Sequence, residues 1–263
     1  MNRVIKQVGF LIVVLTTLCA CTNESVDPEI SMLKRIVEVA IDGSSSTTTL
    51  NYNGNKIVSI DKADAFLEFF YTGSLITKIV ETNKTTSNKN TLDYGYADGL
   101  LNSITSSDNY VVRYTHNKDG SVSYEKWTKS ANNTAVAEYY GTLFFDNDNL
   151  IKDERIREDN QKGIIKTTTI NSFFDNRNNA LRHIKGFDKL LDFAKIASAN
   201  NCLLHSESNS EKHLDTNQII SSIKRADHKI QYNAAGYPTE IISENIIFGG
   251  SDSNHLKSQL FYN

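Results

Sequence analysis

The chain has 263 residues, with 28 Lys and Arg against 31 Asp and Glu, and its net charge is −3 at pH 7. It lacks the basic surplus and the Lys/Arg clusters that bind phosphate backbones, so we expect no nucleic-acid partner. A chain of this length can bury one large core or two small ones.

The first 20 residues have the three parts of an export signal. Arg3 and Lys6 give a positive start, residues 8–18 are apolar, and the small residue Ala20 precedes Cys21. An apolar run of 11 residues is too short for a permanent transmembrane helix. The end of this segment, Leu18-Cys19-Ala20-Cys21, resembles the bacterial lipobox, which implies cleavage before Cys21 and a lipid on its thiol.

Lipidation of Cys21 predicts a protein of the cell envelope that is held on the outer membrane by acyl chains. Removal of residues 1–20 takes away Arg3 and Lys6, so the net charge becomes −5, and residues 21–32 are expected to form a flexible tether. The tether carries spread acidic residues, which leaves the surface and the periplasmic face of the membrane both open. The alternative is an ordinary secretory signal followed by an accidental cysteine.

A repeated turn unit follows the tether. Its first copy is Tyr52-x-Gly54-x-x-Ile57-x-x-Ile60, its second is Tyr71-x-Gly73-x-x-Ile76-x-x-Ile79, and a looser third is Tyr96-x-Asp98-x-x-Leu101-x-x-Ile104. In this unit an aromatic residue ends one strand, a residue that tolerates positive φ makes the reversal, and an apolar residue starts the return strand. The repeats predict consecutive hairpins over residues 33–173, with strands at 65–72, 75–82, 109–116, 121–129, 136–145 and 164–173.

The pattern changes after residue 173. Apolar residues at helical spacing predict one short amphipathic helix near 186–199, and residues 206–217 are expected to form a polar loop. Strands are expected again at 219–232, 239–248 and 256–262. The predicted fold is therefore mainly β: an antiparallel meander of consecutive hairpins, forming a curved open sheet, with one helix, in a single domain over residues 33–263.

The turn unit Tyr232-Asn-Ala-Ala-Gly-Tyr-Pro-Thr-Glu-Ile241, together with the lipobox and the repeats, resembles uncharacterised Bacteroidetes-type lipoproteins that carry YD-like repeats. The segment Phe174-Asp-Asn-Arg-Asn-Asn-Ala180 is similar to a recurrent segment of the same proteins. The resemblance implies an antiparallel sheet of hairpins related in style to Rhs-type YD repeats. It implies no activity.

The sequence contains no nucleophile elbow, no paired-histidine zinc motif and no phosphate loop. His205 and His213 share a polar stretch with acidic residues, but their spacing fits no familiar ligand pattern, so we expect no catalytic residue, no metal and no cofactor. The acidic run at 146–149 is expected to be a turn rather than a calcium loop. Cys202, left without a disulfide partner by lipidation of Cys21, is expected to be a buried small hydrophobe.

Trp127, the one tryptophan, is the aromatic residue that we first assign to ligand binding, although aromatic residues on strands more often pack the sheet. The leading functional hypothesis is a non-enzymatic binding or structural module that contacts a glycan, a peptide or a partner protein. The alternative is a polymer hydrolase tethered at the cell envelope, and a third hypothesis is a partner protein in envelope assembly or immunity.

Overall fold

The computed structural model describes residues 31–129, 134–247 and 254–263. The predicted signal segment, Cys21 and most of the predicted tether lie outside these residues. The described residues form sixteen strands in one antiparallel sheet. In chain order these are β1 Leu33–Ala40, β2 Ser45–Asn53, β3 Lys56–Asp61, β4 Ala65–Thr72, β5 Leu75–Asn83, β6 Lys89–Ala97, β7 Leu100–Ser106, β8 Tyr110–His116, β9 Val122–Lys129, β10 Ala135–Asp146, β11 Asn149–Asp159, β12 Ile164–Asn178, β13 Asn200–His213, β14 Ile219–Tyr232, β15 Pro238–Ile247 and β16 Asn254–Tyr262.

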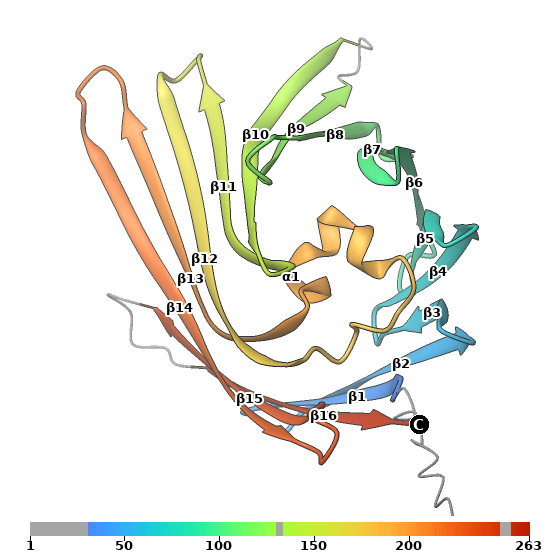
Figure 1. Cartoon of the computed structure of the whole chain (residues 1–263). Coiled ribbons are helices and arrows are strands. Elements are labelled where there is room, and N and C mark those ends of the chain that lie inside the picture. The colour runs from blue at the N-terminus through green and yellow to red at the C-terminus, as the bar shows by residue number, and fades with distance from the viewer. Residues whose placement is uncertain (1–30, 130–133, 248–253) are drawn as a thin grey trace, which may run out of the picture.

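The sheet closes into a barrel, because β1 pairs with β2 on one side and with β16 on the other (Figure 1). The prediction of an open curved sheet is therefore wrong. The predicted hairpins are present, since each strand pairs with its neighbour in the chain. Closure removes the two free edges that an open sheet would expose to edge-to-edge association.

The repeated turn unit also explains why the sheet closes. The strand register shifts next to the aromatic residue of the unit at Tyr52, Tyr71 and Tyr96, and again at Phe145 and Tyr232. Each shift is a β-bulge, and a bulge bends its strand and increases the local twist. Bulges repeated along consecutive hairpins bend the sheet steadily until its first and last strands meet.

The reversals have the backbone that the turn residues predict. Gly54 and Gly73 have φ of 62° and 61°, and Asn147 and Asp148 both have positive φ, as a type I′ hairpin requires. The acidic run at 146–149 is thus a turn between β10 and β11. Phenol groups then link successive hairpins: the Tyr52 hydroxyl donates to the Leu33 carbonyl at 2.7 Å, and the Tyr96 hydroxyl donates to the Ile76 carbonyl at 2.8 Å.

The helical segment lies inside the ring of strands (Figure 1). We call residues 180–197 the lumen segment. It contains three short pieces, η1 Phe187–Lys189, η2 Leu191–Phe193 and α1 Ala194–Ala197, in place of one continuous helix at 186–199. The helix breaks at Leu190, which has an extended backbone. No helix in the described ranges is long and apolar enough to cross a membrane.

The core is formed between the lumen segment and the inward side chains of the strands. Phe187 and Leu190 are 1% and 0% exposed, and they belong to one apolar cluster with Ile57, Ile76 and Leu101. The apolar side chains of the lumen segment pack against the inward side chains of the strands, which explains the amphipathic pattern of this segment.

The prediction of a polar loop at 206–217 is wrong. Most of it belongs to β13, which pairs with β12 and β14 along its length. Sequence patterns identify a strand by one apolar face, and this part of β13 has none. Its inward side chains, Glu207, Asn209 and Glu211, face a part of the lumen away from the apolar core.

Candidate functional site

Two of the cavities inside the barrel share Lys195 of α1 as a lining residue. The first, which we call the tyrosine cavity, has a volume of about 380 Å³. Four tyrosines from β8, β9 and β10 line it: Tyr110, Tyr114, Tyr124 and Tyr139. Strand pairing brings these side chains to one inner face, because they lie at inward positions of neighbouring strands.

Two cations lie among these rings. The Lys126 ammonium is 4.5 Å from the ring centre of Tyr110, and the Arg155 guanidinium is 4.6 Å from that of Tyr139. Attraction between a cation and an aromatic face holds both partners in place. The Tyr124 hydroxyl donates to Asp153 at 2.6 Å and accepts a bond from Arg155 Nε at 3.3 Å. The cavity therefore combines fixed aromatic faces with charged hydrogen-bonding groups.

Asp192 of η2 brings a carboxyl group to the same cavity. It accepts a hydrogen bond from the Tyr94 hydroxyl at 2.7 Å. Asp192 has an exposed surface in the lumen, but the atoms of the surrounding barrel wall limit its solvation. This burial raises the pKa of Asp192 to about 6, so the group ionises close to neutral pH.

The second cavity, which we call the histidine cavity, has a volume of about 410 Å³. Cys202, His205 and His228 line it, and one ligand atom from each lies within 4.8 Å of the other two. A bulge in β13 makes this possible. Phe173 pairs with Leu204 while Phe174 pairs with Cys202, so Leu203 is an extra residue, and Cys202 and His205 share the inner face.

His228 reaches the same place from β14. It lies two residues beyond Ala226, the partner of His205, and the two imidazole rings stack with centres 5.6 Å apart. His228 Nδ1 is 2.8 Å from the Ser243 hydroxyl. Burial, with Lys195 and His228 as further causes, lowers the pKa of His205 to about 4, and burial and Lys195 also lower the pKa of His228. Both rings are therefore neutral at pH 7.

Solved structures with a similar fold include two crystal structures of porin-like proteins, one from Bacteroides vulgatus ATCC 8482 and one from Bacteroides uniformis ATCC 8492. The first is 10% identical over 89% of this chain and 99% of its own, with a TM-score of 0.56. The fold is that of a porin-like protein. The second is 11% identical over 88% of this chain and 98% of its own, with a TM-score of 0.46. No protein-family model and no curated protein matches the sequence.

The outward side chains along two rows of the barrel wall are mostly polar. Tyr124 is buried on the lumen side, so its neighbour Glu125 faces outward. Residues paired directly across strands share a face, which allows the outward row through Glu125 to be followed from β6 to β14. The row consists of Gly95, Ser103, Arg113, Glu125, Tyr140, Ile156, Thr167, Ser210 and Ser221. The next row consists of Thr115, Ser123, Thr142, Glu154, Thr169, Ser208 and Ile223.

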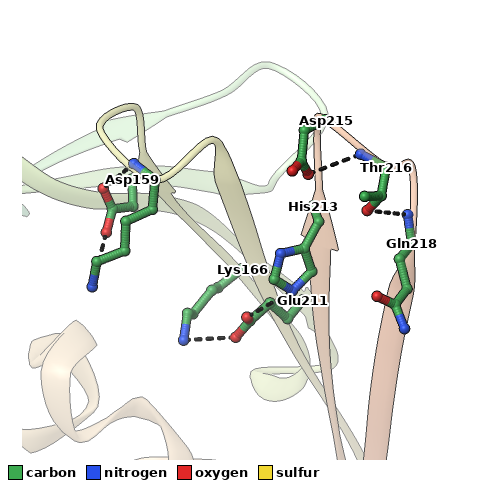
Figure 2. A network of polar contacts seen from close by, with 8 residues as sticks. Asp159, Lys166, Glu211, His213, Asp215, Thr216 and Gln218 are labelled. Carbon is green, nitrogen blue, oxygen red and sulfur yellow. Dashed lines mark hydrogen bonds and ion pairs between the residues drawn. The ribbon is translucent and has the colours of Figure 1, made fainter.

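The residues singled out from sequence lie apart from one another. Trp127 of β9 lies on the outer face, where its indole N–H donates to Glu125 at 3.0 Å, and it lines neither cavity. His213 lies near the far end of β13, in a network with Glu211 and Lys166 (Figure 2). Eight residues of strand separate His213 from His205, about 26 Å at 3.3 Å per residue, so these two histidines cannot bind one ion.

The sequence analysis missed both cavities. The tyrosine cavity had a signal, because Tyr110 and Tyr114 are spaced to share one face of β8. No sequence pattern indicated the grouping of Cys202, His205 and His228, because it depends on a bulge in β13 and on the register of β14. Cys202, expected to be a buried small hydrophobe, is only half-buried and lies beside two histidines.

Proposed function

We propose that this protein is a lipid-anchored binding protein of the cell envelope, and that the tyrosine cavity holds a small carbohydrate. The observation that carries this proposal is the cavity itself, with four tyrosine rings and the side chains of Lys126 and Arg155 around about 380 Å³ of space. Small-molecule sites commonly have volumes of about 300–1,000 Å³, with aromatic walls and a few fixed polar groups.

A carbohydrate fits this lining in two ways. The C–H faces of a sugar ring are apolar and can stack on tyrosine rings, while its hydroxyl groups need donors and acceptors at the edges. Lys126 and Arg155 supply donors, and Asp153 and Asp192 supply acceptors. An aliphatic ligand would displace water from these charged groups without offering them hydrogen bonds in return, which is costly even where they form ion pairs, as Lys126 does with Glu138 and Arg155 with Asp153.

We propose an acyl anchor rather than a spanning barrel for its attachment to the envelope. A barrel that crosses a membrane presents an apolar band about 25 Å tall to the lipid. The two outward rows of this barrel contain Arg113, Glu125 and Glu154, and most of their other members are hydroxyl residues. The lumen segment also fills part of the interior. These features support a barrel that hangs in water from lipid on Cys21, as in the YD-repeat lipoproteins that the sequence resembles.

The carbohydrate proposal can be tested with a saccharide array, followed by calorimetric titration of each saccharide that binds. Tyr139→Ala removes one wall of the cavity and a contact of Arg155, and is expected to weaken binding about tenfold or more, equivalent to about 1.4 kcal/mol. Trp127→Ala is the matched control, because Trp127 lies on the outer face, and it is expected to leave binding unchanged.

Two results would contradict the carbohydrate proposal. One is the absence of binding to any mono- or disaccharide on the array. The other is a loss of affinity in Trp127→Ala with none in Tyr139→Ala, which would place the ligand site on the outer surface.

Lys126→Met provides a second variant inside the cavity, since it removes the cation between Tyr110 and Tyr139 while keeping most of the side-chain volume.

Loss of the anchor should release the protein. Cys21→Ala is expected to move nearly all of the chain from the membrane fraction to the soluble fraction, because no acyl chain can then be attached. Cys19→Ala is the matched control and should remain in the membrane fraction. Persistence of Cys21→Ala in membranes after a carbonate wash, or an unmodified Cys21 thiol in the mass spectrum of the wild-type protein, would contradict the proposal.

The hydrolase hypothesis remains the weaker candidate. Asp153 and Asp192 both line the tyrosine cavity, but each accepts a hydrogen bond from a tyrosine hydroxyl, Tyr124 and Tyr94 respectively. A general acid or a nucleophile must reach the scissile bond, whereas each tyrosine hydroxyl fixes one oxygen of its carboxylate at the cavity wall and leaves the other oxygen to accept from a ligand. Incubation of any bound saccharide with the protein, followed by mass spectrometry, would reveal turnover if this hypothesis holds.

A further inference from the structure

We propose that Cys202, His205 and His228 form a binding site for one zinc-class divalent ion inside the barrel. The site is separate from the proposed carbohydrate site, and its test does not depend on that proposal. Its donor set is one sulfur and two imidazole nitrogens, which are the ligands that Zn²⁺ takes most often in proteins.

The spacing of the three ligand atoms suits such an ion. With Zn–S of about 2.3 Å and Zn–N of about 2.0 Å, tetrahedral ligand atoms lie about 3.5 Å from one another. The three atoms of this cluster all lie within 4.8 Å of one another. Side-chain rotations that move each atom by about 1 Å are enough to close the site around an ion. The positions come from two adjacent strands of a closed sheet, so the backbone beneath them is fixed.

The hydrogen bonds around the histidines leave room for an ion. His205 Nδ1 is buried and has no hydrogen-bond partner among the residues that the structure describes, which is rare for a buried polar atom. An ion is the partner that this nitrogen lacks. Ser243 contacts Nδ1 of His228 and leaves its Nε2 available. A metal-ligating histidine almost always donates its second ring N–H to an oxygen acceptor, and the Ser243 hydroxyl oxygen is placed to be that acceptor.

The local charges are compatible with a cation. The Lys195 ammonium lies 3.4 Å from His205 Nε2. Its long, exposed side chain can turn away from the histidines toward the tyrosine cavity, which it also lines. Glu38 of β1 lines the histidine cavity and offsets the charge of Lys195. Metal binding converts the Cys202 thiol to a thiolate and releases one proton to solvent, while the two neutral imidazoles bind through their lone pairs. The fourth position faces the histidine cavity, where water or a small ligand completes the tetrahedron.

The test uses the full-length protein, extracted in detergent and stripped with a chelator under reducing conditions. Titration with Co²⁺ as a spectroscopic probe is expected to show one ion per chain and a thiolate-to-metal charge-transfer band, and one equivalent of Zn²⁺ should displace it. Cys202→Ser should abolish the band. His228→Gln should weaken Zn²⁺ binding about tenfold or more, since one of three protein ligands is lost.

Two further variants keep the test decisive. Ser243→Ala removes only the outer contact of His228, and is expected to weaken Zn²⁺ binding about tenfold even if a ligand variant fails to fold. His213→Gln is the matched control: His213 lies beside Glu211 near the far end of the same strand, and its loss should leave affinity unchanged. The proposal is overturned if Co²⁺ gives no charge-transfer band, or if His213→Gln weakens binding as much as His228→Gln.

Discussion

Replacing Phe187 with alanine is expected to lower the free energy of unfolding by about 3–5 kcal/mol, the usual cost of removing a buried aromatic side chain. Phe187 is 1% exposed and packs inside the barrel with Phe193, their ring centres 5.4 Å apart. The loss should be large because the lumen segment lies within a closed sheet, which cannot collapse around the space that is left. Equilibrium denaturation in urea, followed by the fluorescence of Trp127, measures the change.

Phe173→Ala is the matched control for this measurement. Phe173 is 62% exposed, at a position of β12 that the structure leaves open to solvent. Its replacement is expected to change the free energy of unfolding by less than about 0.5 kcal/mol. Equal effects of the two substitutions would mean that the lumen segment contributes nothing to the core, and would contradict the fold described above.

Gly186→Ala is expected to destabilise the protein by about 2–5 kcal/mol, through two separate costs. Gly186 has φ of 75°, a conformation that costs an alanine about 1–2 kcal/mol. A Cβ atom there would also collide with the carbonyl oxygen of Ser74, in the turn between β4 and β5, and such overpacking adds about 1–3 kcal/mol. The close approach of Gly186 to Ser74 is what allows the lumen segment to enter the barrel beside this hairpin.

Gly73→Ala separates the two costs. Gly73 has φ of 61°, but a Cβ atom at this position would meet no atom within 4 Å. Its substitution should therefore show the backbone cost alone, about 1–2 kcal/mol. If Gly186→Ala is no more destabilising than Gly73→Ala in the same urea titration, the lumen segment does not pack against the hairpin as the structure indicates.

The two cavities differ in what a change of pH should do to them. The Asp192 carboxyl in the tyrosine cavity has a pKa of about 6, so its charge varies between pH 5 and 7. Burial lowers the pKa of the His205 imidazole to about 4, so this ring stays neutral over the same range, and burial also lowers the pKa of His228. A ligand of the tyrosine cavity that contacts Asp192 therefore meets a change of charge that His205 does not undergo.

Local structure could be read from the sequence where a residue acts through its own backbone or its nearest neighbours. The spacing of Tyr52, Gly54 and Ile57, repeated 19 residues later, predicts hairpins, and the strands at 65–72 and 219–232 are found with those bounds. Gly73 reverses the chain because it tolerates positive φ, which is a property of that residue alone. The helical tendency of the lumen segment is also local, because it follows from the spacing of apolar residues along that segment.

Closure and the cavities required the tertiary structure. Closing the barrel depends on the sum of many small bends, and no single bulge reveals whether β1 and β16 meet. The polar half of β13 has no apolar face, because its inward side chains line the lumen, so sequence patterns read it as a loop. Cys202 and His228 are 26 residues apart in the chain, and only the extra residue Leu203 and the pairing of β13 with β14 bring them together. The sequence by itself thus determined the hairpins and is the basis of the anchor proposal, while strand register, which couples distant residues through backbone hydrogen bonds, decided the barrel and which side chains meet inside it.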